Sequence, residues 1–300
     1  MASDEIVRET LRDVRRHHGL EAPRSVAQWE AFARRLLGEP LWQRLEVFRL
    51  ALGLASDRYE REACERALRR GEVSGGSAAW LNEAVELARA DDLQQRFYAF
   101  LGSDTRLQLV AVAARLPLYE ALLPALLQSL PAHLAPRRVL DVGCFAGVVA
   151  CVLARCWPGA EIVGVDAEPR WIAFATELAS SLRLANVRFE AAAFEDLRAP
   201  CSFDLIVWLF VGLPVDDAAR RDAAFGRMYT LLSEHGRVLL LERWEGLQTD
   251  RALRAARNAG FEITARIPVR WRCPAESDED QNSEAFVLCR SAADKFSGHD

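Results

Sequence analysis

The chain has 300 residues, of which 51% are hydrophobic and 27% are charged, and its formal net charge is −5. This composition can bury a sizeable core and excludes a globally disordered chain, while the length suits two domains or one core with an extension. Acidic and basic residues are spread evenly along the chain, so we expect no basic surface of the kind that non-specific phosphate binding needs. The expected partner is therefore a small molecule or a peptide, and nucleic acid is unlikely.

The cysteines and the apolar runs indicate a reducing compartment. The seven cysteines form no Cys-x-x-Cys pair and lie mostly in apolar stretches, which is typical of free buried thiols. The first residues do not open a secretory signal, and no apolar run reaches the ~18 residues of a membrane span. We therefore expect a cytoplasmic protein without a membrane segment. No cluster of metal ligands stands out, so no metal site is predicted.

Residues 1–130 are expected to form an all-helical N-terminal domain, because their apolar side chains recur every three or four positions. A glycine-rich segment at 71–77 interrupts this pattern and is a candidate hinge. The last helix, at 110–130, is long and apolar, and we expect it to bend or break at Pro117 and Pro124. The domain is interpreted as a cap over an active site, with a dimerisation module as the alternative.

Residues 131–300 change to alternating strands and helices, which predicts a parallel sheet covered by helices on both faces. Segments 261–270 and 285–290 leave no room for a crossover helix and should pair as an antiparallel hairpin. The other strands are predicted at 139–142, 161–166, 187–191, 203–209 and 236–242, and the helices at 147–156, 169–184, 217–232 and 249–259. A ligand of such a sheet binds at the carboxyl ends of the strands.

The first of these strands runs into Asp141-x-Gly143-x-x-x-Gly147, just before a helix. Gly143 allows a tight turn and a close approach to a ligand, and the helix after Gly147 presents free N–H groups. The spacing differs from the Gly-x-Gly-x-x-Gly of dinucleotide-binding loops. Asp166 ends the second strand, where a carboxylate can accept both hydroxyls of a ribose. These two features predict a nucleoside-binding site.

With these motifs, residues 134–290 resemble the class I (Rossmann-like) S-adenosylmethionine-dependent methyltransferases. The resemblance implies a seven-stranded, mostly parallel α/β sheet that closes with an antiparallel hairpin, and S-adenosylmethionine as the cofactor. The segments that carry it are Val139–Gly147, Asp166, Val187–Leu197, Phe203–Val207, Val238–Leu241 and the final hairpin.

The resemblance also implies which residues hold the cofactor. Backbone groups around Asp141 would reach its amino group, and Asp166 would hold its ribose. The full set is Asp141, Gly143, Cys144 and Gly147 beside the methionine part, Asp166 at the ribose, Ala167, Ala193 and Phe194 around the adenine, and Trp208 facing the methyl group.

Two residues depart from the family's pattern. Phe145 stands where many members have glycine, and its ring either points away from the ligand or crowds it. Ala193 stands where many members have an aspartate that accepts from the adenine amino group, a role that Glu195 or a backbone carbonyl could take over. These departures motivate one alternative function, a non-catalytic cofactor-binding partner subunit.

The acceptor side has candidates but no unmistakable general base. The segment 208–214 is not the Asn/Asp-Pro-Pro-Tyr/Phe tetrapeptide of enzymes that methylate base amino groups, and no glutamate pair resembles that of protein arginine methyltransferases. Arg115 and Tyr119 lie one helical turn apart and could close on the cofactor carboxylate. The candidate substrate residues are Tyr98, Arg115, Tyr119, Leu209, Asp216 and Trp244.

We therefore expect a methyltransferase that acts on an O or N atom of a small molecule or peptide, in natural-product biosynthesis. Transfer to a well-positioned nucleophile needs no general base, because proximity alone can supply much of the rate. The alternative with the same fold is an RNA or protein methyltransferase. A homodimer formed through the helical domain is also left open.

Overall fold

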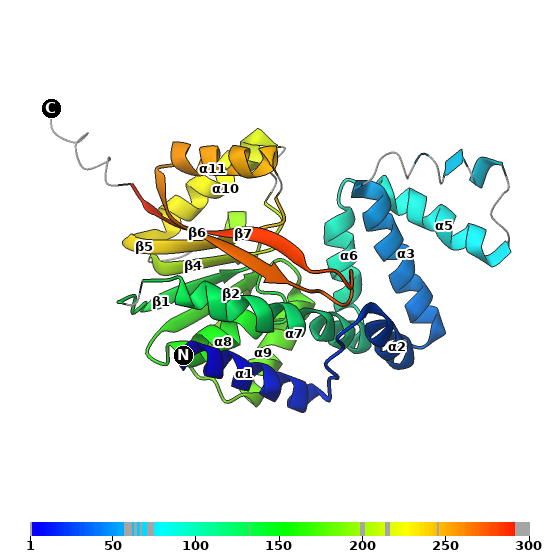
Figure 1. Cartoon of the computed structure of the whole chain (residues 1–300), viewed down its shortest axis with the longest axis horizontal. Coiled ribbons are helices and arrows are strands. Elements are labelled where there is room, and N and C mark those ends of the chain that lie inside the picture. Colours follow the sequence, from blue (N-terminus) through cyan, green and yellow to red (C-terminus); the bar gives the residue numbers. More distant parts are fainter. Residues whose placement is uncertain are drawn as a thin grey trace.

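The structure is a computed structural model of the whole chain (Figure 1). It describes residues 2–56, 62, 65–66, 68–70, 75–131, 133–198, 202–213, 217–244 and 246–291. Asp216 and residues 71–74 of the predicted hinge lie outside this part of the chain, while residues 75–77 open a helix.

The N-terminal region is helical, as its periodicity predicts. Ser25 and Asp104 each cap a helix, because their side chains accept from the backbone N–H of Gln28 and Arg106. The helices are α1 (Ala2–His18), α2 (Val26–Leu37), α3 (Glu39–Ser56), α5 (Gly75–Ala88), α6 (Leu93–Gly102) and α7 (Thr105–Gln128). Helix α7 continues through Pro117 and Pro124, so the expected interruption does not occur.

The C-terminal region is the predicted α/β fold, with seven strands in the order β3-β2-β1-β4-β5-β7-β6. Strands β1 to β5 pair in parallel, and β7 pairs antiparallel with both β5 and β6. The strands are β1 (Arg138–Val142), β2 (Glu161–Asp166), β3 (Val187–Ala191), β4 (Phe203–Leu209), β5 (Leu232–Leu241), β6 (Phe261–Trp271) and β7 (Gln281–Arg290). The mostly parallel sheet and its closing hairpin are thus confirmed.

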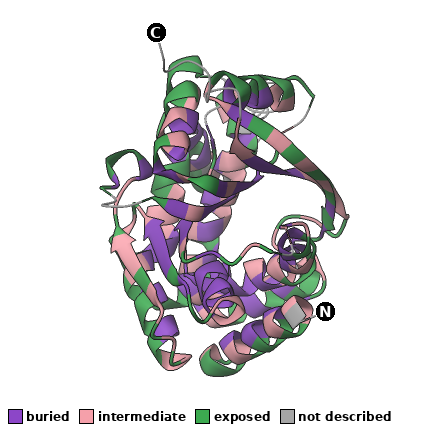
Figure 2. Ribbon diagram, turned by 90° about the vertical axis from the view of Figure 1, so that its left-hand side faces the viewer, coloured by how far each residue is buried: buried purple, intermediate pink, exposed green. Residues whose placement is uncertain are grey.

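Two apolar cores cover the two faces of the sheet (Figure 2). Helices α8 (Val148–Cys156) and α9 (Pro169–Ser181) share one core with α1, α2 and α7. Helices α10 (Ala218–Leu231) and α11 (Leu247–Asn258) form the other core on the opposite face. Because side chains alternate along a strand, Val139 and Leu205 point to the α7 side, and Leu140 and Ile206 to the α10 side.

Helix α7 is long and apolar enough to cross a membrane by length and composition. In this structure it packs against α1, α2, α6 and β6, and Leu107, Leu116 and Leu118 on it are fully buried. It is therefore the central helix of the core on its side of the sheet.

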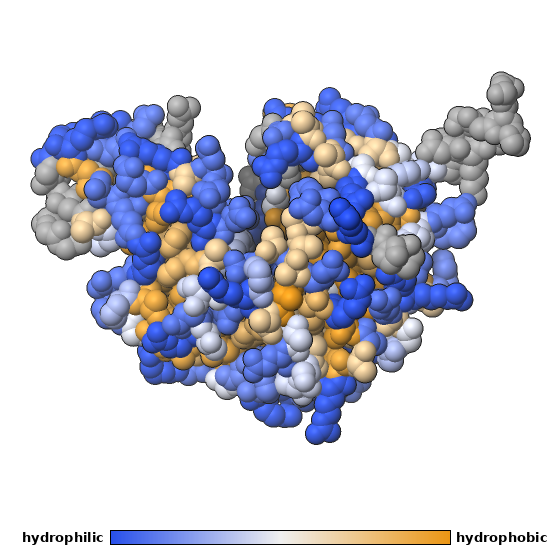
Figure 3. All heavy atoms as spheres, turned by 180° about the vertical axis from the view of Figure 1, so that it is seen from behind, coloured by the Kyte–Doolittle hydropathy of each residue, from blue (hydrophilic) through white to orange (hydrophobic). Residues whose placement is uncertain are grey.

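Helix α5 and the second half of α3 pack apart from this core, whereas Trp42 and Leu45 near the start of α3 belong to it. Phe48 and Leu54 of α3 pack with Val85 and Leu87 of α5 in a separate apolar cluster that also includes Leu93 at the start of α6. We call these helices the α3/α5 lobe. Figure 1 shows the lobe to one side of the sheet, and Figure 3 shows a deep notch between it and the rest of the molecule.

Candidate functional site

The loop after β1 has the strained geometry that its glycines predict. Gly143 and Gly147 have φ values of +62° and +74°, in the left-handed region that glycine enters freely. A Cβ on Gly147 would lie 2.6 Å from Cβ of Ala175 and 2.8 Å from the ring of Phe189, so glycine is also required for packing. The motif therefore forms the predicted tight turn between β1 and α8.

Phe145 adopts the conformation of the glycine that many family members have at its position. Its φ is +50°, which costs a non-glycine residue roughly 1–2 kcal/mol. The ring packs at 3.9 Å between centroids on Trp171 of α9, and edge-on at 6.0 Å to Tyr98 of α6. Burial of the ring offsets the strain, and the contact joins the loop to helices α6 and α9.

Asp166 lies at the carboxyl end of β2 and accepts two backbone hydrogen bonds. Its Oδ2 accepts from the N–H of Phe145 and its Oδ1 from the N–H of Glu168, each at 3.0 Å. Burial raises the pKa of this carboxyl group, and the two amides oppose the shift. Each oxygen keeps a further lone pair, so the carboxylate can still accept from ligand hydroxyls. Glu168, not Asp166, caps α9.

Asp141 is a buried carboxyl group with an unsatisfied oxygen. Its residue is 3% exposed, and its Oδ2 has no hydrogen-bond partner among the described residues. Burial, with a further contribution from Asp166, raises its pKa to about 8. An unpaired buried oxygen is costly and is relieved by a donor, above all a cationic one. The position therefore fits the ammonium group of an amino-acid ligand.

Helices α6 and α7 bring a cation and two phenols to the same place. Nη2 of Arg115 donates to the hydroxyl of Tyr98 at 3.0 Å. Burial raises the pKa of Tyr119, and among its electrostatic neighbours Arg115 opposes this shift while Asp141 adds to it. Arg115 and Tyr119 are only partly buried. The structure thus gathers three predicted residues of the helical region, and one of them, Tyr119, lies near Asp141.

The side chains of Trp208 and Phe194 belong to the core and not to an open site surface. Trp208 is 4% and Phe194 7% exposed, and their rings meet edge-on at 5.1 Å in the cluster on the α10 side. Their side chains therefore present little surface to a ligand, which leaves the backbone of these segments for any contact. Leu209 alternates to the α7 side and is partly buried there.

The remaining predicted residues lie around the same strand ends. The N–H of Ala192 donates to the carbonyl of Asp166 at 3.0 Å, which holds the loop containing Ala193 beside β2. Ala167 is exposed, and Cys144 is buried, with its N–H bonded to the carbonyl of Val165. Trp244 is partly buried against the α10-side core. Asp217 caps α10, because its side chain accepts from the N–H of Arg220 at 3.0 Å.

Glu242 is a site residue whose role the sequence did not reveal. It follows β5, is 6% exposed, and bonds to the loop after β4. That loop packs against the glycine turn after β1, because a Cβ on Gly143 would lie 2.9 Å from a methyl carbon of Val211. The available signal was a lone carboxylate directly after the apolar run Val238–Leu241.

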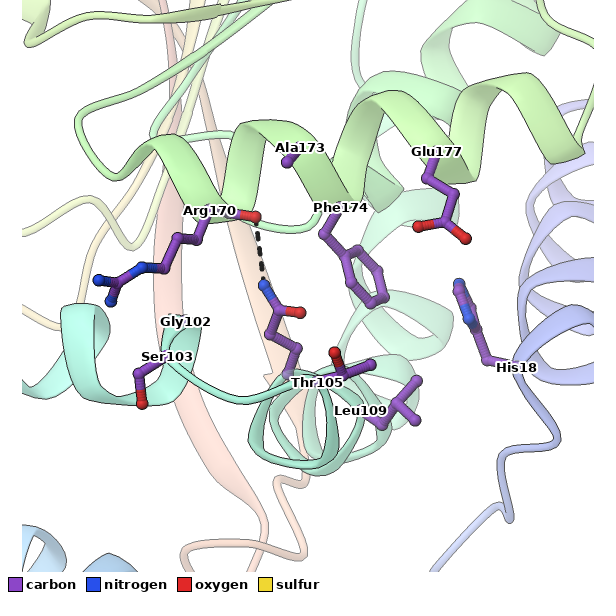
Figure 4. A pocket seen from close by; sticks show the side chains of 10 residues that line it. His18, Gly102, Ser103, Thr105, Leu109, Arg170, Ala173, Phe174 and Glu177 are labelled. Carbon is purple, nitrogen blue, oxygen red and sulfur yellow. Dashed lines mark hydrogen bonds between the residues drawn. The ribbon is translucent and has the colours of Figure 1, made fainter.

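A separate pocket of about 360 Å³ lies between the end of α1, the start of α7 and α9 (Figure 4). His18 stacks on Phe174 there at 4.9 Å, and Nε2 of Gln108 donates to the carbonyl of Arg170 at 3.1 Å. Figure 4 shows His18 facing Glu177. None of the predicted site residues lines this pocket, so it is distinct from the strand-end site.

Comparison with known proteins points to one family. A model of the methyltransferase domain matches residues 135–278. The demethylmenaquinone methyltransferase of Thermus thermophilus is 34% identical over 109 residues, which are 36% of this chain and 48% of that protein. The ribosomal RNA small subunit methyltransferase G of Paracidovorax citrulli is 36% identical over 104 residues, 34% of this chain and 42% of that protein. The chain thus spans less than half the length of these curated relatives.

Among solved structures, an O-methyltransferase of a polyketide synthase from Brevibacillus brevis, in complex with S-adenosylhomocysteine, aligns with a TM-score of 0.48 and 14% identity. The alignment covers 60% of this chain and 75% of that one. The glycine turn, the two strand-end carboxyl groups and the domain match agree, and residues 135–278 form a methyltransferase domain of the class I (Rossmann-like) S-adenosylmethionine-dependent type.

Proposed function

We propose that this protein is an S-adenosylmethionine-dependent methyltransferase that acts on an O or N atom of a small molecule or peptide in natural-product biosynthesis. The observation that carries the cofactor part is the unsatisfied buried oxygen of Asp141 beside the glycine turn, with Arg115 and Tyr119 on α7 and Asp166 at the next strand end. The methionine end of the cofactor is zwitterionic, and its nucleoside carries two ribose hydroxyls. The three charged side chains match these groups in number and in charge.

The chain's own residues would bind and orient the cofactor, which supplies an electrophilic methyl group on a sulfonium when bound. Asp141 would accept from its ammonium, Arg115 and Tyr119 would donate to its carboxylate, and Asp166 would accept from its ribose. Charge-assisted bonds of this kind are stronger than neutral ones. Holding the acceptor in line with the methyl group is then the main remaining task, and it needs no general base.

The acceptor would enter through the notch between the α3/α5 lobe and the α/β region. Tyr98, Leu209 and Trp244 are the predicted acceptor-side residues that are partly buried, the first two against the α7-side core and Trp244 against the α10-side core. A Cβ on Gly212 would lie 3.1 Å from Nε2 of Gln94 on α6, so the helical region contacts the loop after β4. This contact supports a cap over the site in preference to a dimerisation module. A cytoplasmic location and a possible homodimer complete the proposal.

Two alternatives to this function can be tested by experiment. The similarity to a ribosomal RNA methyltransferase keeps RNA as a second acceptor class. Phe145 and Ala193 keep a non-catalytic cofactor-binding subunit as the third reading.

Calorimetric titration with S-adenosylmethionine and S-adenosylhomocysteine tests the cofactor first. We expect micromolar affinity and a loss of about tenfold or more in Asp166→Ala, since a charged acceptor of ligand hydroxyls is removed. Asp222→Ala, an exposed carboxylate on α10, is the matched control and should bind like the wild type. Absence of binding by the wild type would refute the proposal.

The acceptor class is tested with methyl-labelled S-adenosylmethionine and a cell extract. Label in the low-mass or peptide fraction supports the proposal, whereas label in RNA favours the second candidate. Tight cofactor binding with no labelled product in any fraction favours the non-catalytic subunit.

A further inference from the structure

The side chain of Glu242 is bonded to the loop after β4. This loop contacts both the glycine turn at residues 143–147 and helix α6 of the helical region. Oε1 of Glu242 accepts from Nε1 of Trp208 at 2.7 Å, from the N–H of Gly212 at 2.7 Å and from the N–H of Leu213 at 3.1 Å. The N–H of Val211 also stabilises its charged form. Three successive backbone amides and one indole therefore converge on a single buried carboxylate.

The backbone of residues 210–213 is shaped for this purpose. Phe210 and Gly212 have φ values of +57° and +87°, so left-handed residues flank Val211. Left-handed residues in such turns let successive N–H groups point into one concavity, which is a backbone anion-binding nest. The left-handed conformation of Phe210 costs roughly as much as that of Phe145, and a bound carboxylate repays this cost.

The loop at residues 210–213 contacts two neighbouring segments, the glycine turn and helix α6. Val211 lies so close to Gly143 that a Cβ there would come within 2.9 Å of one of its methyl carbons. Gly212 lies equally close to Gln94 of α6, and the N–H of Phe210 donates to the carbonyl of Leu241 at 2.8 Å. The loop is thus the point where the cofactor turn, the helical region and the sheet meet.

We propose that Glu242 is a positioning residue, whose carboxylate pins residues 210–213 so that Val211 forms a fixed wall beside Gly143. This inference rests on the proposed function, because it assigns the wall to the methyl-donating end of the cofactor site. Glu242 acts through the loop and does not reach the acceptor, since its carboxylate is buried and its oxygen is shared by three donors.

A role in global stability alone does not account for a carboxylate here. Burying a charge carries a large desolvation penalty, and an apolar side chain of similar volume often gives equal or greater stability. Trp208 and Leu213 on either side already belong to the apolar core. The charge is therefore explained by the loop conformation that it selects.

The test compares Glu242→Leu, Glu242→Gln and Trp208→Phe with the wild type. One readout is the affinity for S-adenosylhomocysteine by calorimetry, another is hydrogen exchange of the peptide that spans residues 209–213, and the third is the melting temperature. Glu262→Leu, which replaces an exposed glutamate on β6, is the matched control and should change neither affinity nor exchange.

We expect Glu242→Leu to weaken binding about tenfold and to speed exchange of the loop by a similar factor, since it removes every bond to the nest. Its melting temperature should fall by only about 2–4 °C, since burial of the leucine side chain offsets part of the lost bonds. Glu242→Gln keeps an accepting oxygen, and Trp208→Phe removes one donor of the set, so each should show a partial effect of about threefold.

Wild-type affinity and wild-type loop exchange in Glu242→Leu would overturn the inference. If that variant unfolds, the two milder variants decide, and an effect on melting temperature without one on exchange or affinity would overturn it as well. A wild-type protein that binds no S-adenosylhomocysteine would refute the proposed function alone. The exchange of residues 209–213 would still report whether Glu242 holds the loop.

Discussion

The helices of the N-terminal region divide into two groups that look alike in sequence but pack differently. Helices α1, α2 and α7 bury Leu11, Trp29 and Leu116 in the same core as the strands. Helix α5 and the second half of α3 bury Val85 and Phe48 in a separate cluster, while Trp42 and Leu45 at the start of α3 belong to the main core. Helix α6 bridges the two, with Leu93 in the lobe cluster and Leu101 in the main core.

The two groups of helices are suited to two different roles. One group supports the site, and the other is suited to move. The helices of the main core belong structurally to the α/β fold, and α7 carries Arg115 and Tyr119 to the strand ends. The α3/α5 lobe packs mainly against α2 and α6 and borders the notch. Local opening is easiest where few buried contacts hold a part in place, so the lobe is the part suited to move.

The largest expected effect separates the two groups by stability. Leu116→Ala on α7 should lower the free energy of unfolding of the whole protein by about 2–5 kcal/mol, because it leaves a cavity in the main core. Leu54→Ala on α3 should destabilise only the lobe and leave the main transition within about 0.5 kcal/mol. Urea denaturation followed by near-ultraviolet and far-ultraviolet circular dichroism measures both. Equal shifts of one transition would mean that lobe and main core unfold as one unit.

The next largest effect tests whether side chains of α7 bind the cofactor in addition to packing in the core. Arg115→Ala should weaken S-adenosylhomocysteine binding about 30-fold, and Tyr119→Phe about threefold, since the first removes a charge-assisted bond and the second a neutral one. Arg106→Ala lies on the same helix, where Arg106 pairs with Asp104, and should leave the affinity unchanged. Unchanged affinity in both site variants would confine α7 to a packing role.

The pH dependence of binding should likewise come from the main core. Burial raises the pKa of Asp141 to about 8, and pairing with an ammonium requires its ionised form. Affinity should therefore rise about eightfold from pH 6.5 to 7.5, as the ionised fraction grows from roughly 3% to roughly 24%. Calorimetry at the two pH values measures this, and proton release should accompany binding.

Asp141→Asn is the control for that experiment and should abolish the pH dependence. The raised pKa also means that Asp141 favours the folded protein when protonated. Its contribution to the stability of the unliganded protein is complete below the ordinary carboxyl pKa and is lost as the pH rises through about 8. A pH-independent affinity in the wild type would contradict the proposed pairing.

The smallest effect concerns the aromatic contact between the cofactor turn and α6. Phe145→Gly relieves about 1 kcal/mol of backbone strain but loses ring contacts with Trp171 and Tyr98, so we expect a net destabilisation of about 1–2 kcal/mol. The affinity for S-adenosylhomocysteine should change less than about threefold. A gain of about tenfold would show that the ring crowds the cofactor.

Much of the fold could be predicted because the strands are short apolar runs with clear ends. The ranges 161–166, 187–191 and 203–209 match β2, β3 and β4 to the residue. β5 begins at Leu232, before the expected Gly236, where its pairing with β4 shifts in register. Helix α7 passes Pro117 and Pro124 because burial of its leucines outweighs the loss of two backbone bonds, and local propensity cannot show this.

Some features of the candidate site could likewise be predicted from the sequence, and others depend on how the strands pair. The glycine turn and the two strand-end carboxylates could be read locally, because a turn and a strand terminus are set by neighbouring residues. The side to which Trp208 points depends on pairing: Asp141 lies opposite Val207 and Val142 opposite Trp208, so Asp141 and Trp208 face opposite sides of the sheet. A site on the α7 side therefore uses Asp141 and leaves the Trp208 ring in the opposite core.

The sequence by itself determined the α/β architecture and the positions of Asp141, Gly143, Gly147 and Asp166, since each follows from periodicity or from a turn. Together these motifs also carried the resemblance to a methyltransferase domain. Only the tertiary structure decided that Tyr119 lies near both Arg115 and Asp141, that Phe145 packs on Trp171, and that Glu242 binds the loop after β4. These contacts join segments far apart in the chain. They depend on the packing of whole helices and strands, which short-range patterns do not encode.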